Sequence, residues 1–140
     1  MIIKRLDPED AILGTKAVKL YKDMVVKTEN MKRFLENKGT YLVVAEDEEE
    51  PVGFLLAYVL PRIDRNSAKL FIYELEVAAE HRRKGIGTAL INFVRKIVKE
   101  EKFMNAFVFT SYSNKEAVEF YKHTGGHIVN GDDLMFVYTA

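Results

Sequence analysis

The pattern of hydrophobic and polar positions divides this 140-residue chain into strand-like and helix-like stretches. Short apolar runs bounded by glycine, proline or acidic residues predict strands over 1–6, 40–47, 51–60, 68–77 and 105–110. Apolar residues at helical spacing predict helices over 7–26, 28–39, 86–98 and 113–126. Residues 127–138 predict a closing hairpin that turns at Asn130 and Gly131.

Residues that commonly start and stop helices support these boundaries. Asp7 followed by Pro8 predicts the N-cap and first position of the first helix. Gly39 is expected to end the second helix. Ser113 and Glu116 have the spacing of a capping box, and two glycines close the helix that they begin.

The element order is therefore β-α-α-β-β-β-α-β-α-β-β. It predicts an α+β, three-layer fold, with one mixed, mostly antiparallel sheet flanked by helices. No internal repeat, linker or low-complexity segment interrupts the chain, so residues 1–140 are expected to form a single domain.

Composition narrows the classes of function. Lys plus Arg and Asp plus Glu both number 21, so no overall field favours nucleic acid or an anionic membrane. The absence of cysteine excludes disulfides, thiolate catalysis and cysteine-ligated zinc. No apolar run resembles a signal peptide or reaches membrane-spanning length, so we expect a cytoplasmic protein.

The stretch "EHRRKGIGTALINF", residues 80–93, combines three cations with two glycines directly before a predicted helix. Helix N-terminal amides and the helix dipole attract anions, and glycine lets an anion approach the backbone closely. The spacing fits neither a P-loop nor a dinucleotide fingerprint, since Leu90 stands where the latter needs a small residue. A solvated basic turn is the plain alternative, but the strand and helix around it favour a phosphate cradle.

The segment "RRKGIG" after "ELEV" resembles the acetyl-CoA signature of the GNAT superfamily of N-acetyltransferases, and the element order fits that fold across the chain. The resemblance implies acetyl-CoA as acetyl donor, with no metal. It assigns coenzyme A contacts to Leu75, Val77, Ala78, Arg82, Arg83, Lys84, Gly85, Ile86, Gly87, Thr88, Ala89, Asn114, Ala117 and Tyr121.

Four blocks are similar, in the same order, to small aminoglycoside 3-N-acetyltransferases: "LAYVLPRID", "IYELEV", "EHRRKGIGTALIN" and "AVEFYKHTGG". The chain departs from those enzymes at Asn114 and Lys115, where they carry an acidic pair suited to a polycationic sugar. This difference weakens the case for an aminoglycoside acceptor without affecting coenzyme A binding.

Regular alternation along residues 68–77 predicts that Leu70, Ile72, Glu74 and Glu76 share one sheet face. An acceptor amine must lose a proton before it can attack, and a nearby carboxylate can accept that proton. Glu74 is the first candidate for this base and Glu76 the second, with solvent-facing glutamates as the alternative. The resemblance implies that Tyr121 protonates the departing thiolate; ordinary core packing is the other interpretation of Tyr121.

The sequence thus predicts an acetyl-CoA-dependent N-acetyltransferase acting by direct attack in a ternary complex. The expected acceptor is a small-molecule amine such as an aminoglycoside, followed by a protein or peptide N-terminus. A catalytically silent acyl-CoA-binding module and a nucleic-acid-binding domain are the rivals from other classes. No nucleic acid, membrane or metal partner is expected, and the resemblance is compatible with a homodimer.

Overall fold

The computed structural model describes residues 1–132 and 134–140. The chain forms two compact units, residues 1–109 and residues 110–140, and each is described by itself below. The first unit contains the sheet, three α-helices and two short 3₁₀ helices, at Pro8–Asp10 and Ala79–His81.

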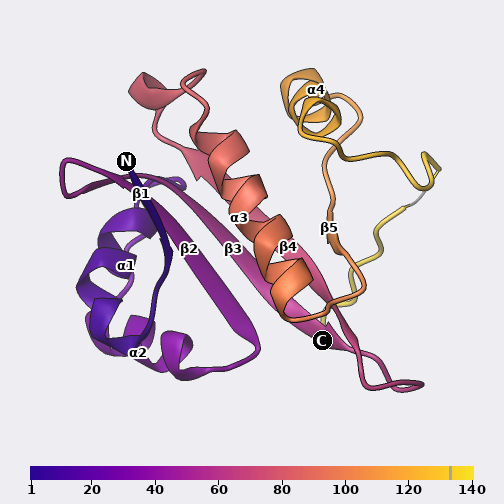
Figure 1. Cartoon of the computed structure of the whole chain (residues 1–140), viewed down its shortest axis with the longest axis horizontal. Helices are drawn as coiled ribbons and strands as arrows, with labels where there is room; N and C mark the ends of the chain where they lie inside the picture. Colours follow the sequence, from indigo (N-terminus) through magenta and orange to yellow (C-terminus); the bar gives the residue numbers. More distant parts are fainter. Residues whose placement is uncertain (133) are drawn as a thin grey trace. The chain divides into compact units, whose positions relative to one another are not determined.

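The first unit is built on one mixed sheet, with strand order β1-β2-β3-β4-β5 (Figure 1). The strands are β1 (Ile2–Arg5), β2 (Thr40–Asp47), β3 (Glu50–Pro61), β4 (Ala68–Val77) and β5 (Ala106–Val108). The first four strands pair antiparallel, and β5 pairs parallel to β4. The expected mixed, mostly antiparallel sheet is therefore confirmed.

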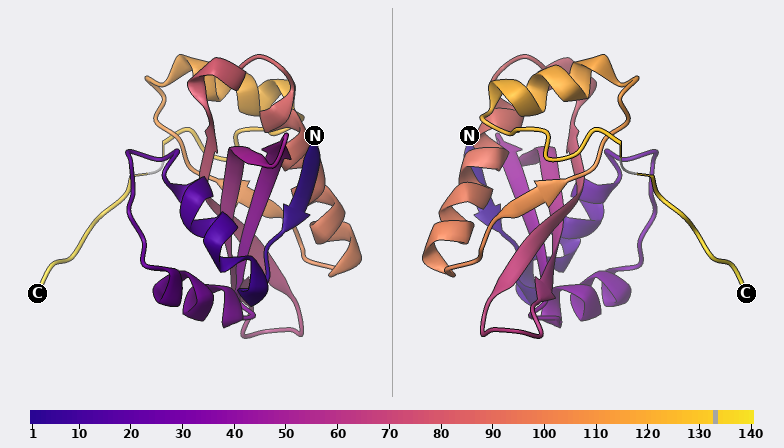
Figure 2. Two further views of the ribbon diagram at one scale, coloured as in Figure 1. Left: turned by 90° about the vertical axis from the view of Figure 1, so that its left-hand side faces the viewer. Right: turned by 90° about the vertical axis from the view of Figure 1, so that its right-hand side faces the viewer.

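Helices cover both faces of this sheet, giving the expected three layers. Helices α1 (Ala11–Val18) and α2 (Thr28–Glu36) lie on one side, and α3 (Ile86–Glu100) lies on the other (Figure 2). Leu42 and Phe54 pack with Met31 of α2 in a buried core on the first side. A side chain at Gly53 would come within 3.1 Å of Ile86 and 3.4 Å of Leu90, so α3 packs directly on the backbone of β3.

The predicted helix over residues 7–26 is shorter in the structure. Asp7 caps its first turn in a capping box, as expected. The α-helix ends at Val18, however, and Lys22 and Asp23 take left-handed φ angles of 51° and 54°. A right-handed helix cannot continue through two left-handed residues, so the chain turns there. Helix α1 packs closely against α2, since a Cβ on Gly14 would lie 2.9 Å from the Met31 side chain.

Two predicted helix caps are wrong. Helix α2 ends at Glu36 with Asn37 as its C-cap, and Gly39 instead donates its N–H to the Asn37 side chain at 2.8 Å. Helix α4 (Lys115–His123) in the second unit is capped by Asn114 rather than by Ser113. Asn114 follows Ser113 directly and is an equally good capping residue, so the spacing alone could not distinguish them.

The closing hairpin predicted over residues 127–138 is not formed in this structure. Residues 127–132 and 134–140 contain no strand, and Asp133 lies outside the described residues. The side-chain oxygen of Asn130 accepts the N–H of Asp132 at 3.0 Å, so a local turn does form at the expected place. Apolar alternation creates a strand only when a partner strand accepts its hydrogen bonds, and no such pairing is present in this part of the described chain.

Among the described residues, no helix has the length and hydropathy needed to cross a membrane.

Candidate active site

The loop between the Ala79–His81 turn and α3 has the backbone geometry of an anion cradle. Gly85 takes a left-handed φ of 83° at the N-cap of α3, and no side chain caps that end of the helix. Arg83, two residues earlier, also has a left-handed φ, of 61°. Arg82, Arg83 and Lys84 are all exposed. Alternating backbone conformations of this kind turn successive N–H groups toward one point, where they bind anions.

The first turn of α3 supplies the donors of this cradle. The N–H of Ala89 donates to the carbonyl of Gly85 at 3.0 Å, which is the first helical hydrogen bond. The amides of Ile86, Gly87 and Thr88 precede it, so they have no acceptor within the helix. Ile86 is itself anchored, with a side chain only 5% exposed. A Cβ at Gly85 would meet no atom within 4 Å, so the space beside this residue is open, and free amides at a helix start of this kind can accept an anion such as a diphosphate.

Beside this loop, the last part of β4 has an open edge. Strand β5 pairs only with residues Leu70 to Ile72, although β4 continues to Val77. The N–H of Ala78 donates to the carbonyl of Val52 in β3 at 2.8 Å. Ala78 and Val52 are therefore a hydrogen-bonded pair of the antiparallel ladder. Hydrogen-bonded and non-hydrogen-bonded pairs alternate along such a ladder, so Val77 and Leu75 are in non-hydrogen-bonded pairs and their backbone groups point away from β3.

Two of the backbone carbonyls at this strand end already accept hydrogen bonds within the chain. The carbonyl of Val77 accepts a hydrogen bond from Nε of Arg82 at 3.2 Å, which ties the cationic loop to the strand. The carbonyl of Ala78 accepts the N–H of His81 at 2.8 Å. The groups that face the open edge are therefore the N–H of Val77 and both backbone groups of Leu75.

A β-bulge in β4 changes which side chains share a face. Tyr73 has no partner in β3: Ile72 lies opposite Ala57, and the next residue in register is Glu74, opposite Leu56. One extra residue in a strand inverts the alternation beyond it. The bulge also comes directly after the last β4 residue that pairs with β5, so it marks where the two strands part.

The predicted composition of the two β4 faces is consequently wrong. Cross-strand partners project from the same face, so Glu76 lies on the side of its partner Phe54, the side covered by α1 and α2. Glu74, two residues earlier, shares that face. Leu70 and Ile72 lie on the opposite face, which α3 covers. The two glutamates remain together, but the bulge separates them from the apolar residues with which regular alternation had grouped them.

The two glutamates differ in their electrostatic surroundings. Partial burial raises the pKa of Glu76, and the negative charge of Glu74 raises it further. The positive charges of Arg82 and Lys22 act against this shift. Glu76 is thus a carboxyl group that holds its proton more tightly than usual, next to the cationic loop. Lys22 was not a sequence candidate, because its proximity depends on the turn after α1, which has no sequence signature.

The remaining predicted residues lie on or next to α4, in the second unit. The side chain of Asn114 accepts the N–H of Ala117 at 3.2 Å, so Asn114 acts as the helix cap. Tyr121 lies in the last turn of α4, partly buried, with its ring centroid 5.3 Å from that of Phe120. Its carbonyl accepts the N–H of Gly126 at 2.8 Å, as expected for a glycine-terminated helix.

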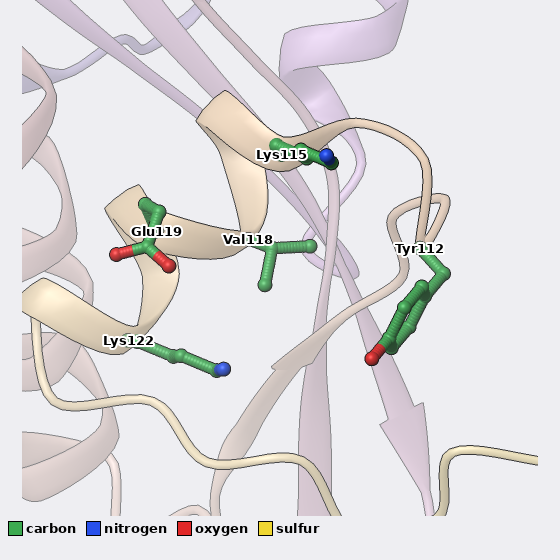
Figure 3. A pocket seen from close by; sticks show the side chains of 5 residues that line it. All are labelled: Tyr112, Lys115, Val118, Glu119 and Lys122. Atoms are coloured by element: carbon green, nitrogen blue, oxygen red, sulfur yellow. The ribbon is translucent and has the colours of Figure 1, made fainter.

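One side of α4 borders a hollow of about 290 Å³ (Figure 3). Val118 lies in its centre, and Tyr112 faces the helix from the preceding loop. The charged residues at its margin are Lys115, Glu119 and Lys122. Asn114, Ala117 and Tyr121 do not line it. The hollow therefore lies on a different side of α4 from the residues assigned to coenzyme A.

The architecture and the cationic glycine turn define a class of protein, the GNAT-like α+β acetyltransferase fold. This chain belongs to the acetyltransferase (GNAT) family, whose model matches residues 11–125. The family uses acetyl-CoA as acetyl donor.

Known relatives agree with this placement. The human N-acetyltransferase 8 is 29% identical over 108 residues, which are 75% of this chain and 48% of that protein. The L-2,4-diaminobutyric acid acetyltransferase of Shouchella clausii (strain KSM-K16) is 35% identical over 78 residues, 54% of this chain and 42% of that protein. The chain thus spans about half the length of these curated relatives.

Among solved structures, an aminoglycoside acetyltransferase, meta-AAC0020, from an uncultured soil metagenomic sample is similar over nearly the whole chain. Its complex with trehalose superposes with a TM-score of 0.91 at 26% identity, covering 99% of this chain and 95% of that one. The same enzyme in complex with sisomicin gives a TM-score of 0.91 at 25% identity, with the same coverage.

Proposed function

We propose that this chain is an N-acetyltransferase that transfers an acetyl group from acetyl-CoA to the primary amine of a small molecule by direct attack. The observation that carries the proposal is the left-handed Gly85 at the uncapped start of α3, flanked by exposed cations and beside the open edge of β4. Family membership supports the donor, and the loop supports diphosphate binding.

In this proposal the cationic loop and the first amides of α3 hold the diphosphate of coenzyme A. The open edge of β4 offers the N–H of Val77 and the backbone of Leu75 to an extended ligand, much as a sheet edge accepts a peptide strand. Bound acetyl-CoA would supply an activated thioester carbonyl. A backbone N–H at the strand edge would donate a hydrogen bond to that carbonyl and so stabilise the charge that develops on its oxygen.

The face of β4 that carries both glutamates supplies the base. A raised pKa makes a carboxylate a stronger base near neutral pH, which supports Glu76 in this role, whereas the sequence had favoured Glu74. Either carboxylate would take the proton directly or through a water. Tyr121, assigned on the resemblance, would donate its phenolic proton to the departing thiolate, because a phenol is protonated at neutral pH.

An aminoglycoside or similar small amine is the first candidate acceptor, supported by the structural relatives, which are described as aminoglycoside acetyltransferases. A protein or peptide N-terminus is the second, because zebrafish N-alpha-acetyltransferase 50 is 37% identical over 71 residues. The cytoplasmic location, the single-domain organisation and the homodimer stay predictions.

The test is release of free coenzyme A thiol over a panel of aminoglycosides, diamino acids, polyamines and peptide N-termini. We expect one amine class to stimulate release, and Tyr121→Phe to slow that release by a much larger factor than it weakens coenzyme A binding. If coenzyme A binds but no amine stimulates release, the protein is a silent acyl-CoA-binding module. Failure to bind coenzyme A at all would exclude both functions.

Glu74→Gln and Glu76→Gln, compared with each other, test the base. A general base contributes about 10²- to 10⁴-fold to rate, so the base variant should lose that much in kcat. The other variant should lose much less, because both substitutions keep the size and polarity of the side chain. Equal and small losses in both variants would remove the glutamates from the mechanism.

A further inference from the structure

The turn that follows α1 brings a cation to the sheet face that carries the two glutamates. Tyr21, in this turn, packs against the core cluster that contains Phe54, and Phe54 is the cross-strand partner of Glu76. The Nζ atom of Lys22, the next residue, lies 5.1 Å from the centroid of the Tyr21 ring. In both views of Figure 2, α1 and β4 run toward the same end of the sheet. The turn therefore places Lys22 near the end of β4, on the face that carries Glu74 and Glu76.

Buried neighbours hold the backbone on both sides of Lys22. Leu20, Tyr21 and Val26 pack against the core beneath α1 and α2. Between them, Lys22 and Asp23 have left-handed φ angles of 51° and 54°, which a residue with a Cβ adopts only where its surroundings impose them. Lys22 itself is exposed. Its backbone is thus fixed by residues of the core, while its side chain is not covered by the rest of the first unit.

The charge of Lys22 reaches Glu76 without neutralising it. The positive charges of Lys22 and Arg82 both act to lower the pKa of Glu76. Arg82 also donates from Nε to the carbonyl of Val77, whereas Lys22 forms no ion pair with any carboxylate in residues 1–132 and 134–140. Lys22 and Glu76 are therefore close enough for their charges to interact and too far apart to pair directly. A ligand with both an amine and an anionic group can pair with both side chains at once.

We propose that the acceptor amine also carries a carboxylate, and that Lys22 binds this carboxylate while the amine lies at Glu76. The inference rests on the proposed function, because it names the class of acceptor for that same site. An acceptor of this kind complements both protein charges, whereas Lys22 repels a polycation. Among the small amines proposed above, the geometry thus favours an amino acid or a similar amine with a carboxylate over a polycation such as an aminoglycoside.

Pairs of amines that differ only in a carboxylate test this assignment. The pairs are ornithine and putrescine, lysine and cadaverine, and phenylalanine and phenethylamine. Each amine is titrated calorimetrically into the protein saturated with coenzyme A, and each is assayed for thiol release with acetyl-CoA. A hydrogen bond between charged groups is worth about 10-fold or more in affinity, and solvent at this exposed lysine keeps the effect near that lower limit. We expect the carboxylate-bearing member of at least one pair to bind about 10-fold more tightly and to have the lower KM. Equal, weaker or absent binding in every pair would overturn the proposal.

Variants of Lys22 show whether this side chain is the cause of the preference. Lys22→Gln should raise the KM of the carboxylate-bearing amine about 10-fold without raising that of its carboxylate-free partner, and Lys22→Arg should keep the preference. Lys19→Gln is the matched control, because Lys19 is exposed on the same segment and its charge is not among those that act on Glu76. The assignment is wrong if Lys22→Gln affects both members of a pair equally, since that result indicates a general effect on Glu76 or on the fold.

Binding and turnover together separate this inference from the proposed function. If no amine stimulates thiol release, the transferase function fails, and the calorimetric comparison still decides whether Lys22 selects a carboxylate. If amines stimulate release but the two members of each pair behave alike, the function stands and the role of Lys22 is refuted.

Discussion

Replacing Gly85 with alanine tests the cradle at the start of α3 with a single added carbon. Gly85 has φ 83° and ψ 7°, in the left-handed region that costs a residue with a Cβ about 1–2 kcal/mol. The new Cβ would have no atom within 4 Å, so no steric clash adds to this cost within the described chain. The expected penalty of Gly85→Ala is therefore conformational and amounts to about 1–2 kcal/mol.

This penalty must be seen in one of two measurements. If the loop keeps its left-handed conformation, the free energy of unfolding falls by about 1–2 kcal/mol, and Tm falls by roughly 3–10 °C. If the free loop instead relaxes, binding of coenzyme A must restore the strained conformation. The affinity then falls by about 5- to 30-fold, which is the same energy expressed as an equilibrium constant.

The assay is urea or thermal unfolding together with calorimetric titration of coenzyme A, on the same protein preparation. Gly131→Ala is the matched control, because its Cβ also meets no atom within 4 Å and its φ lies outside the left-handed region. We expect the control to stay within about 0.5 kcal/mol of the parent protein. If Gly85→Ala changes neither unfolding free energy nor affinity, the strained amide cradle does not exist.

Three further predictions concern groups elsewhere in the first unit. Because the pKa of Glu76 is raised on folding, the folded protein binds this proton more tightly than the unfolded chain does. The free energy of unfolding therefore falls as the pH rises from the unfolded pKa through the folded pKa. Glu76→Gln should therefore gain unfolding free energy relative to the parent between pH 4 and 7, and an unchanged difference across that range would refute the shift. Leu90→Ala, at a fully buried position, should cost about 2–5 kcal/mol in urea unfolding, and a loss below 1 kcal/mol would contradict its burial. Asp7→Ala removes a capping box and should cost about 0.5–2 kcal/mol, whereas Asp7→Asn should retain most of that stability.

Much of the candidate site could be predicted because its signals are local. A glycine with left-handed φ, cations beside it and an amphipathic helix after it all lie within residues 82–98, so their spacing is visible in the sequence. The same holds for Asp7 and for the strands of the first unit. Two neighbouring polar residues can be equally good helix caps, and the sequence does not show at which of them the helix begins. For this reason the sequence predicts Ser113 as the N-cap, whereas Asn114 is the N-cap in the structure.

The features that escaped prediction depend on partners far away in the sequence. Nothing in "LFIYELEV" shows that Tyr73 is the extra residue of a bulge, because the bulge exists only in the register with β3. That one residue determines which sheet face carries Glu76. The turn after α1 brings Lys22 close enough to influence the pKa of Glu76.

The sequence alone therefore determined the order of the elements in the sheet unit, the layers they form and the place of the cationic glycine turn. The tertiary structure decided which face the glutamates occupy, where β5 leaves β4, and that residues 127–132 and 134–140 form no strand here. The physical reason is the range of the interactions. Periodicity and capping act within a few residues, whereas strand register and the burial of an apolar run require a partner surface from elsewhere.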